Sequence, residues 1–174
     1  DNIKLPGIER STKDEVDVFT KEELKLIINH KCNRTIKPIA LVSLSTGMRQ
    51  GEILGLKWSD IDFENKEIHI ERTLSAYCEI INGKRKFTKT IQSPKTKNSI
   101  RTIPLPDSLI DVFKEVRVKQ NKNKLLHGDR YNRNNEEYVF LSREGELLSR
   151  TCVLTAWKIY LKNCNVRYLK FHAL

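Results

Sequence analysis

Apolar residues recur at helical spacing in several stretches of the chain, and most of these stretches have a recognisable start or end. The first begins after Thr20, which forms a capping box with Glu23. A second helix is expected over residues 36–45 and ends at Gly47, while residues 123–137 are polar and predict a loop. The other expected helices are a short one over residues 49–56, one over residues 107–122, and one that begins after Ser149.

Alternating apolar and polar positions mark the middle of the chain instead. Residues 67–74 alternate cleanly, as in a strand with one buried face. Asn82-Gly83 is a strong hairpin signal and precedes a strand over residues 84–92, and a third strand covers residues 100–105. The sequence therefore predicts a mainly α (α+β) fold with a small three-stranded antiparallel sheet on one edge.

The composition indicates the size of the core and the kind of partner. The 174 residues suit one domain with a real core, since 39% are hydrophobic and 31% are charged. The net charge of +10 points to a polyanion, most often nucleic acid, and less to a membrane surface, because no lysine-rich amphipathic helix stands out. No apolar run approaches the roughly 18 residues needed to span a bilayer, and no signal peptide is apparent. We expect a cytoplasmic, DNA-binding protein.

Metal and nucleotide chemistry find no support in the sequence. The four cysteines are scattered without a CxxC pair, which is typical of reduced thiols, and the four histidines are not at metal-ligand spacing. There is no P-loop and no GxGxxG. We expect no metal site and no cofactor.

The segment from Thr46 to Leu54 holds the first candidate chemistry. Gly47 closes one helix, and Arg49 then opens the next, where backbone N–H groups already favour an anion. A guanidinium there can clamp a phosphate with two hydrogen bonds, and Glu52, one turn later, can hold it in place. A plain surface ion pair between Arg49 and Glu52 is the alternative.

A basic hairpin is the second candidate. No acidic residue occurs between Ile80 and Pro106. Seven positive charges would repel one another there unless an anion neutralised them, which favours a DNA contact over a lysine-rich edge that deters aggregation. The candidate DNA-binding residues are Lys84, Arg85, Lys86, Lys89, Lys95, Lys97 and Arg101.

The lysines of the turn at residues 93–97 have a second possible role. A lysine on a hairpin tip can reach into a groove and protonate a leaving oxygen. From the spacing alone, a purely DNA-binding role is favoured over a catalytic one.

Three motifs occur in a fixed order along the chain. They are Thr46-Gly47-Met48-Arg49-Gln50-Gly51-Glu52-Ile53-Leu54, then Lys95-Thr96-Lys97 before Arg101-Thr102-Ile103-Pro104-Leu105, and finally Phe171-His172-Ala173-Leu174. Together they resemble the catalytic domain of the tyrosine recombinases, the integrases of phages and conjugative transposons. The resemblance covers residues 18–174 and implies that residues 1–17 are an N-terminal arm or linker remnant.

The resemblance implies a mechanism and a role for each matching residue. In this family a tyrosine attacks a DNA phosphodiester and forms a 3′-phosphotyrosine bond without a metal or cofactor. Arg49 matches the arginine that binds the non-bridging oxygens, and His172 matches a histidine that hydrogen-bonds the phosphate. Lys95 matches the general acid, with Lys97 as a competitor, and Glu52 matches a supporting acidic position.

The chain departs from the family pattern after Leu174, where an arginine, a second His or Trp, and the nucleophilic tyrosine are expected. None of its five tyrosines follows a His-x-x-Arg motif. The resemblance thus implies an incomplete catalytic domain that is itself inactive and monomeric, whereas the intact enzyme would act as a tetramer on DNA. A non-catalytic DNA-binding module and a type IB topoisomerase-like strand transferase are the alternatives.

Overall fold

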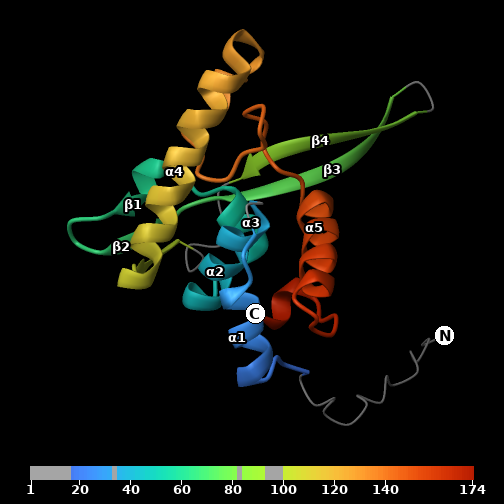
Figure 1. The fold of residues 1–174 in the computed structure, drawn as a ribbon. Helices are drawn as coiled ribbons and strands as arrows, with labels where there is room; N and C mark the ends of the chain where they lie inside the picture. The colour runs from blue at the N-terminus through green and yellow to red at the C-terminus, as the bar shows by residue number, and fades with distance from the viewer. Residues whose placement is uncertain (1–16, 33–34, 82–83, 93–99) are drawn as a thin grey trace, which may run out of the picture.

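Helices form most of the structure, and small antiparallel sheets lie beside them (Figure 1). The computed structural model describes residues 17–32, 35–81, 84–92 and 100–174. Its α-helices are α1 Lys21–Asn29, α2 Ile36–Thr46, α3 Gln50–Leu54, α4 Asp107–His127 and α5 Arg150–Asn163. The mainly α fold expected from the sequence is confirmed.

Three helix ends lie at the capping residues that the sequence predicted, Thr20, Gly47 and Ser149. The Thr20 hydroxyl accepts a hydrogen bond from the Glu23 N–H at 3.2 Å, and the Glu23 carboxylate accepts one from the Thr20 N–H at 2.8 Å. Gly47 ends α2 in the left-handed conformation, with φ of 64°, which suits a residue without Cβ. Ser149 caps α5 by accepting a hydrogen bond from the Cys152 N–H at 3.1 Å.

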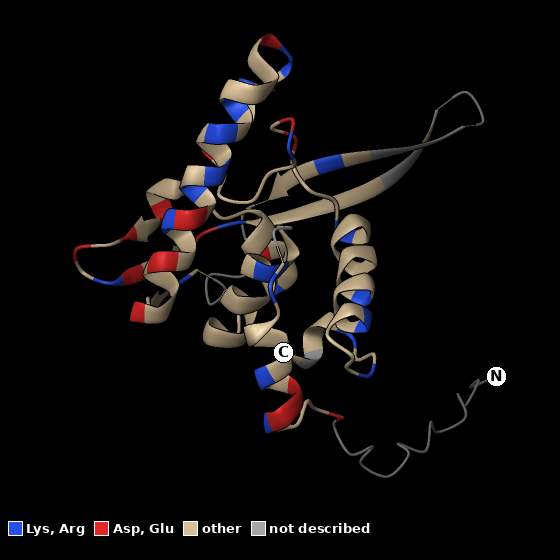
Figure 2. Cartoon of the chain, in the orientation of Figure 1, with Lys and Arg blue, Asp and Glu red and all other residues tan. Residues whose placement is uncertain are grey.

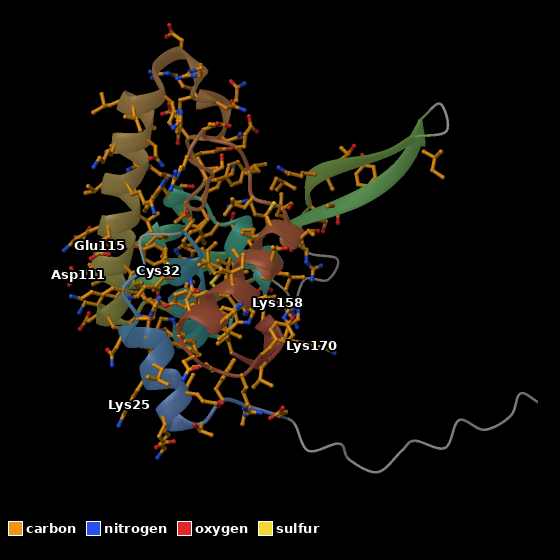
Figure 3. The ribbon with its side chains drawn as sticks, turned by 45° about the vertical axis from the view of Figure 1, so that its right-hand side comes forward. Lys25, Cys32, Asp111, Glu115, Lys158 and Lys170 are labelled. Carbon is orange, nitrogen blue, oxygen red and sulfur yellow. The ribbon has the colours of Figure 1, made fainter. Side chains whose placement is uncertain are left out.

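The core forms around α2, which packs against both α4 and α5. Ile39 and Val42 of α2 are fully buried, as are Phe113 of α4 and Trp157 of α5. Side chains such as Lys158 of α5 lie on the outside instead (Figure 3). Each fully buried side chain of this kind stabilises the fold by about 1.5–3 kcal/mol relative to an exposed one, so the three helices hold one another in place.

The strands form two separate units rather than one. A three-stranded antiparallel sheet has the order β1-β2-β5, and a two-stranded ribbon consists of β3 and β4. The strands are β1 Ile61–Asp62, β2 Glu67–Ile70, β3 Thr73–Ile81, β4 Lys84–Gln92 and β5 Arg101–Pro104. The ribbon projects away from the helices (Figure 1).

A small three-stranded antiparallel sheet was expected, but one of its three strands differs from the expected one. Residues 84–92 pair with β3 in the ribbon, and β1 takes the third place in the sheet. The predicted strand over residues 67–74 is divided because Arg72 pairs with the buried carboxylate of Asp60. That carboxylate also accepts a hydrogen bond from the Lys57 N–H at 2.8 Å. Alternation alone does not reveal such a break, because Ile68 and Ile70 before it and Leu74 after it are all buried at even-numbered positions.

Helix α4 is five residues longer than the sequence suggested, and it takes up the start of the expected loop over residues 123–137. Two contacts hold its second half: Gln120 Nε2 donates to the Tyr138 carbonyl at 2.8 Å, and Lys124 Nζ pairs with Glu136 at 2.6 Å. The remainder of the expected loop contains 3-10 turns, η3 Gly128–Arg130 and η4 Arg133–Asn135. Acidic residues lie towards the start of α4 and basic residues towards its end, as the helix dipole favours (Figure 2). Among the described residues no helix is long and apolar enough to cross a membrane.

Helix α3 lies directly against β3, and glycine permits the close approach. A Cβ atom on Gly51 would lie 2.4 Å from Thr73 Oγ1 and 3.1 Å from the Leu74 carbonyl oxygen. A Cβ on Gly55 would lie 3.1 Å from the Leu74 N. The start of the ribbon is thus fixed to the short helix that follows Arg49.

We expect the Gly51→Ala substitution to lower the free energy of unfolding by about 1–3 kcal/mol, because the added methyl group forces α3 away from β3. Adding Thr73→Ala should restore part of the loss, since it removes the nearest atom. Thermal and urea unfolding of the chain measure both effects, with the exposed Thr155→Ala as the control. Equal stability of Gly51→Ala and the unchanged chain would contradict the close packing.

Candidate active site

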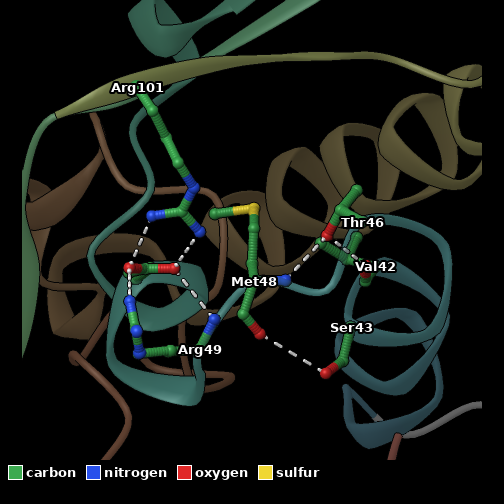
Figure 4. A network of polar contacts seen from close by, with 7 residues as sticks. Val42, Ser43, Thr46, Met48, Arg49 and Arg101 are labelled. Carbon is green, nitrogen blue, oxygen red and sulfur yellow. Dashed lines mark hydrogen bonds and ion pairs between the residues drawn. The ribbon is translucent and has the colours of Figure 1, made fainter. Parts of the chain in front are cut away.

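The turn before Arg49 is held by hydrogen bonds at both ends (Figure 4). The Met48 N–H donates to Thr46 Oγ1 at 3.3 Å, and the Met48 carbonyl accepts from Ser43 Oγ at 3.5 Å. The Met48 side chain itself is buried. Arg49 therefore leaves α2 in a fixed direction and becomes the N-cap residue of α3, in an extended backbone conformation.

Glu52 is the centre of the site, and its carboxylate binds two arginines (Figure 4). Oε2 accepts from the Arg49 N–H at 2.9 Å, and Oε1 accepts from Arg49 Nη1 at 3.2 Å. On its other side, Arg101 Nη1 and Nη2 donate to Oε1 and Oε2 at 3.0 and 2.9 Å, in the two-pronged geometry that a guanidinium and a carboxylate favour. The side chain of Glu52 is only 7% exposed.

These contacts keep Glu52 charged. Burial by itself disfavours the carboxylate, but the hydrogen bonds from Arg101 and Arg49 outweigh it, so the pKa of Glu52 lies below its ordinary value. The same pairing raises the pKa of Arg101. Glu52 is consequently an ionised anchor at neutral pH and not a proton donor.

The outer face of Arg49 stays accessible. Its side chain is 73% exposed, and Nη1 is the only one of its guanidinium nitrogens with a hydrogen bond to the described residues. The other nitrogens can bind an oxyanion while Nη1 stays on Glu52. A plain surface ion pair does not explain this arrangement, because Glu52 is buried and is shared with a third residue from β5.

Only some of the basic residues of the hairpin lie among the described residues. Lys84, Arg85 and Lys86 lie on β4, opposite Ile81, Ile80 and Glu79 of β3. Lys95 and Lys97, the two candidates for the general acid, lie outside the described residues. Lys89 donates a hydrogen bond from Nζ to the Leu147 carbonyl and so ties the ribbon to the segment before α5. DNA contact by these residues, and by Arg101, stays a prediction.

His172 lies on the 3-10 turn η5 Phe171–Ala173 and is exposed to solvent. The neighbouring Phe171 is buried, with its ring edge-on to Trp157 at 5.5 Å. In the described part of the chain no hydrogen bond or ion pair joins His172 to Arg49, Glu52 or Arg101. The structure thus brings together Arg49, Glu52 and Arg101 by direct contact, and its contacts do not extend to His172.

A link between the starts of α3 and α5 was not expected from the sequence. Gln50, which is 1% exposed, donates to the Arg150 carbonyl at 3.3 Å and accepts from Arg150 Nε at 3.4 Å. The pairing of Arg101 with Glu52, across 49 residues of sequence, was not expected either. No local pattern signals either contact. The adjacency of Gln50 to Arg49 was the only hint.

Comparison with known proteins agrees with the motifs. The chain is 41% identical, over 175 aligned positions, to a protein named Tyrosine recombinase XerC-like from Caldanaerobacter subterraneus subsp. tengcongensis, with 99% of this chain and 45% of the relative covered. It is 31% identical over 131 positions to the transposase from transposon Tn916 of Enterococcus faecalis, with 73% of this chain and 30% of the relative covered. The chain thus spans less than half the length of these curated relatives.

Solved structures share the fold. A Tn1549 transposon integrase in complex with transposon right end DNA matches with a TM-score of 0.69 at 21% identity, covering 95% of this chain and 52% of that chain. The XerA recombinase matches with a TM-score of 0.61 at 16% identity, covering 97% and 49%. The model of the phage integrase family matches residues 17–174 of the chain. The motifs, the shared fold and this match over nearly the full length lead to one conclusion: the chain belongs to the phage integrase family, the tyrosine recombinases.

Proposed function

We propose that the intact protein is a site-specific DNA recombinase of the integrase type, which cuts and rejoins double-stranded DNA through a 3′-phosphotyrosine intermediate. Residues 18–174 would supply part of its catalytic domain, and residues 1–17 an arm or linker. Family membership supports this proposal. The structural observation that carries it is the exposed guanidinium of Arg49, held in place by a buried and ionised carboxylate.

The proposed reaction needs positive charge around one phosphate. A tyrosine oxygen attacks the phosphorus, the bond to the 5′ oxygen breaks, and Lys95 or Lys97 donates a proton to that leaving oxygen. Arg49 binds the non-bridging oxygens, whose negative charge grows in the transition state, and His172 hydrogen-bonds the same phosphate. The phosphotyrosine link retains the energy of the broken bond, so the proposed cycle uses no metal ion or nucleotide.

We also propose that the nucleophile is none of the tyrosines in this chain. Tyr131, Tyr138 and Tyr160 are buried, and burial raises the pKa of each phenol, which opposes formation of the attacking phenolate. The Tyr160 hydroxyl already donates to the Ile27 carbonyl at 2.7 Å. Tyr77 and Tyr168 are more exposed, but they lie outside every motif that carries the resemblance.

The proposed partner is double-stranded DNA, with the β3–β4 ribbon as a contact. The run of basic residues from Lys84 to Arg101 and the net charge of +10 support the assignment. The intact protein would act in the cytoplasm as a tetramer on two DNA segments, whereas the present chain alone would be monomeric.

The experiment that tests the proposed function is the Arg49→Ala substitution in the intact protein. We expect it to lower the formation of covalent protein–DNA adducts by at least about 10²-fold, because it removes a charge that acts on the transition state. DNA affinity should fall by much less, since many other cations contribute. Denaturing gels measure the adducts and fluorescence anisotropy measures the binding. Unchanged adduct formation by Arg49→Ala would refute the proposed role of Arg49, whereas an intact protein that binds DNA but forms no adducts would refute the enzyme proposal in favour of a DNA-binding module.

A second prediction concerns the anchor, Glu52. The Glu52→Gln substitution should lower the free energy of unfolding at neutral pH by about 1–3 kcal/mol, because two guanidinium groups lose a charged acceptor. The pKa of Glu52 is lower in the folded than in the unfolded chain, so its contribution is present above the unfolded value of about 4.3 and is lost as the pH falls below it.

Urea unfolding between pH 7 and pH 3 measures this difference, with the exposed Glu64→Gln as the control. The stability of the unchanged chain should approach that of Glu52→Gln on acidification. A constant difference between the two over the whole pH range would mean that the charge of Glu52 contributes nothing.

A third prediction tests the ribbon. Changing Lys84, Arg85 and Lys86 to Glu should weaken DNA binding and flatten its salt dependence, because each lost phosphate contact lowers the slope of log K against log salt by about 0.9. Anisotropy titrations from low to high salt measure the slope. Reversing Lys114, Lys122 and Arg130, which changes the net charge equally in and after α4, is the control. Equal slopes for the two variants would show that net charge, and not the ribbon, determines binding.

A further inference from the structure

The segment before α1 and the start of that helix, residues 17–23, which we name the leading segment, are fastened to the chain that follows α5. Arg167 makes the polar contacts. Its Nε donates to Glu23 Oε1 at 2.8 Å, its Nη2 donates to the Val18 carbonyl at 2.6 Å, and its Nη1 pairs with Asp17. One guanidinium therefore binds three acceptors of the leading segment, roughly 150 residues away in sequence.

A row of aromatic rings makes a second, apolar link between the same two parts. Phe19 of the leading segment is buried, and its ring lies edge-on to Trp157 of α5 with centroids 6.0 Å apart. The ring of Phe171 also lies edge-on to Trp157, with centroids 5.5 Å apart. The indole N–H of Trp157 donates to the Leu169 carbonyl at 3.0 Å. Residues 167, 169 and 171 are thus each fixed by a named contact.

These contacts end one residue before His172. The imidazole has no hydrogen bond or ion pair with any described residue, and the side chain is exposed. Its position therefore follows from the backbone of residues 167–171 and from the short turn in which the Leu174 N–H donates to the Phe171 carbonyl at 3.4 Å. Lys170, labelled in Figure 3, lies within this stretch and points into solvent.

We propose that the leading segment positions His172, through the Arg167 contacts and the Phe19–Trp157–Phe171 row, with Arg167 as the positioning residue. This rests on the proposed function, because it takes His172 as a phosphate-binding group. A displacement of the leading segment would then alter the reaction centre without any contact to DNA. The two links differ in kind: the polar one can be removed without disturbing the core, whereas the aromatic one is part of the core.

A purely structural role of Arg167, in which it only stabilises the fold, would explain the same contacts. The test must therefore separate this role from the positioning of His172. The Arg167→Met substitution removes the charge and the hydrogen bonds but keeps a long side chain. Asp17→Asn weakens the contact from the side of the leading segment and spares Glu23, which also caps α1. Arg133→Gln is the control, since Arg133 is an exposed arginine whose ion pair with Glu136 is long, at 3.8 Å.

The first measurement uses this chain and the NMR signal of the His172 ring, identified by its absence in His172→Gln. We expect Arg167→Met to shift or broaden this signal, Asp17→Asn to move it in the same direction by less, and Arg133→Gln to leave it unchanged. The His69 signal serves as an internal reference, because that ring is tied to Thr102 at 2.9 Å. An unchanged His172 signal in Arg167→Met would overturn the proposal, even if the variant melted at a lower temperature.

The second measurement uses the intact protein and the single-turnover rate of covalent adduct formation. Arg167→Met and His172→Gln should each lower the rate by about 10-fold or more, and the double variant should lose no more than the worse single variant. Losses that multiply, or a His172→Gln variant with the normal rate, would overturn the proposal. Arg49→Ala separates the failure of this proposal from the failure of the proposed function. If Arg49→Ala abolishes adducts while the losses of Arg167→Met and His172→Gln multiply, the positioning role fails and the proposed function stands.

Discussion

A single buried carboxylate organises the candidate active site. Glu52 lies where α3, the turn after α2 and strand β5 meet, and a charge in that place is tolerated only because two guanidinium groups and a backbone N–H surround it. The pairing fixes Arg101 by a two-pronged contact and leaves most of Arg49 free. The guanidinium of Arg49 is therefore held by Glu52 on one side, and its outer face keeps its hydrogen-bonding capacity.

The helices and strands around Glu52 are also linked to one another. Gly51 lets α3 touch the first residues of β3, and Lys89 ties β4 to the segment before α5. Gln50 joins the starts of α3 and α5. The basic ribbon, the helix that carries Glu52, and the helix that leads towards His172 are consequently parts of one packed unit. A glycine, a buried amide and a lysine make these connections.

Local signals were sufficient for three of the helix ends, because capping depends on contacts between residues three or four positions apart. Thr20 with Glu23, Gly47 and Ser149 were all read correctly for this reason. The strands were harder. The alternation of Ile68, Ile70 and Leu74 gave the buried face correctly, but the break at Arg72 depends on Asp60, and the extension of α4 depends on the partners of Gln120 and Lys124. Those contacts are formed between segments, so no window of sequence contains them.

The sequence by itself determined the family, the net positive charge, the helical character and the identity of Arg49, Glu52 and His172 as candidates, since each depends on residue type and short spacing. Only the tertiary structure decided that Arg101 shares the carboxylate of Glu52, that the strands form two units, and that Arg167 joins both ends of the described chain. The physical reason is the same in each case. A hydrogen bond or an ion pair depends on distance in space, and the packing of the helices around α2 brings these partners together.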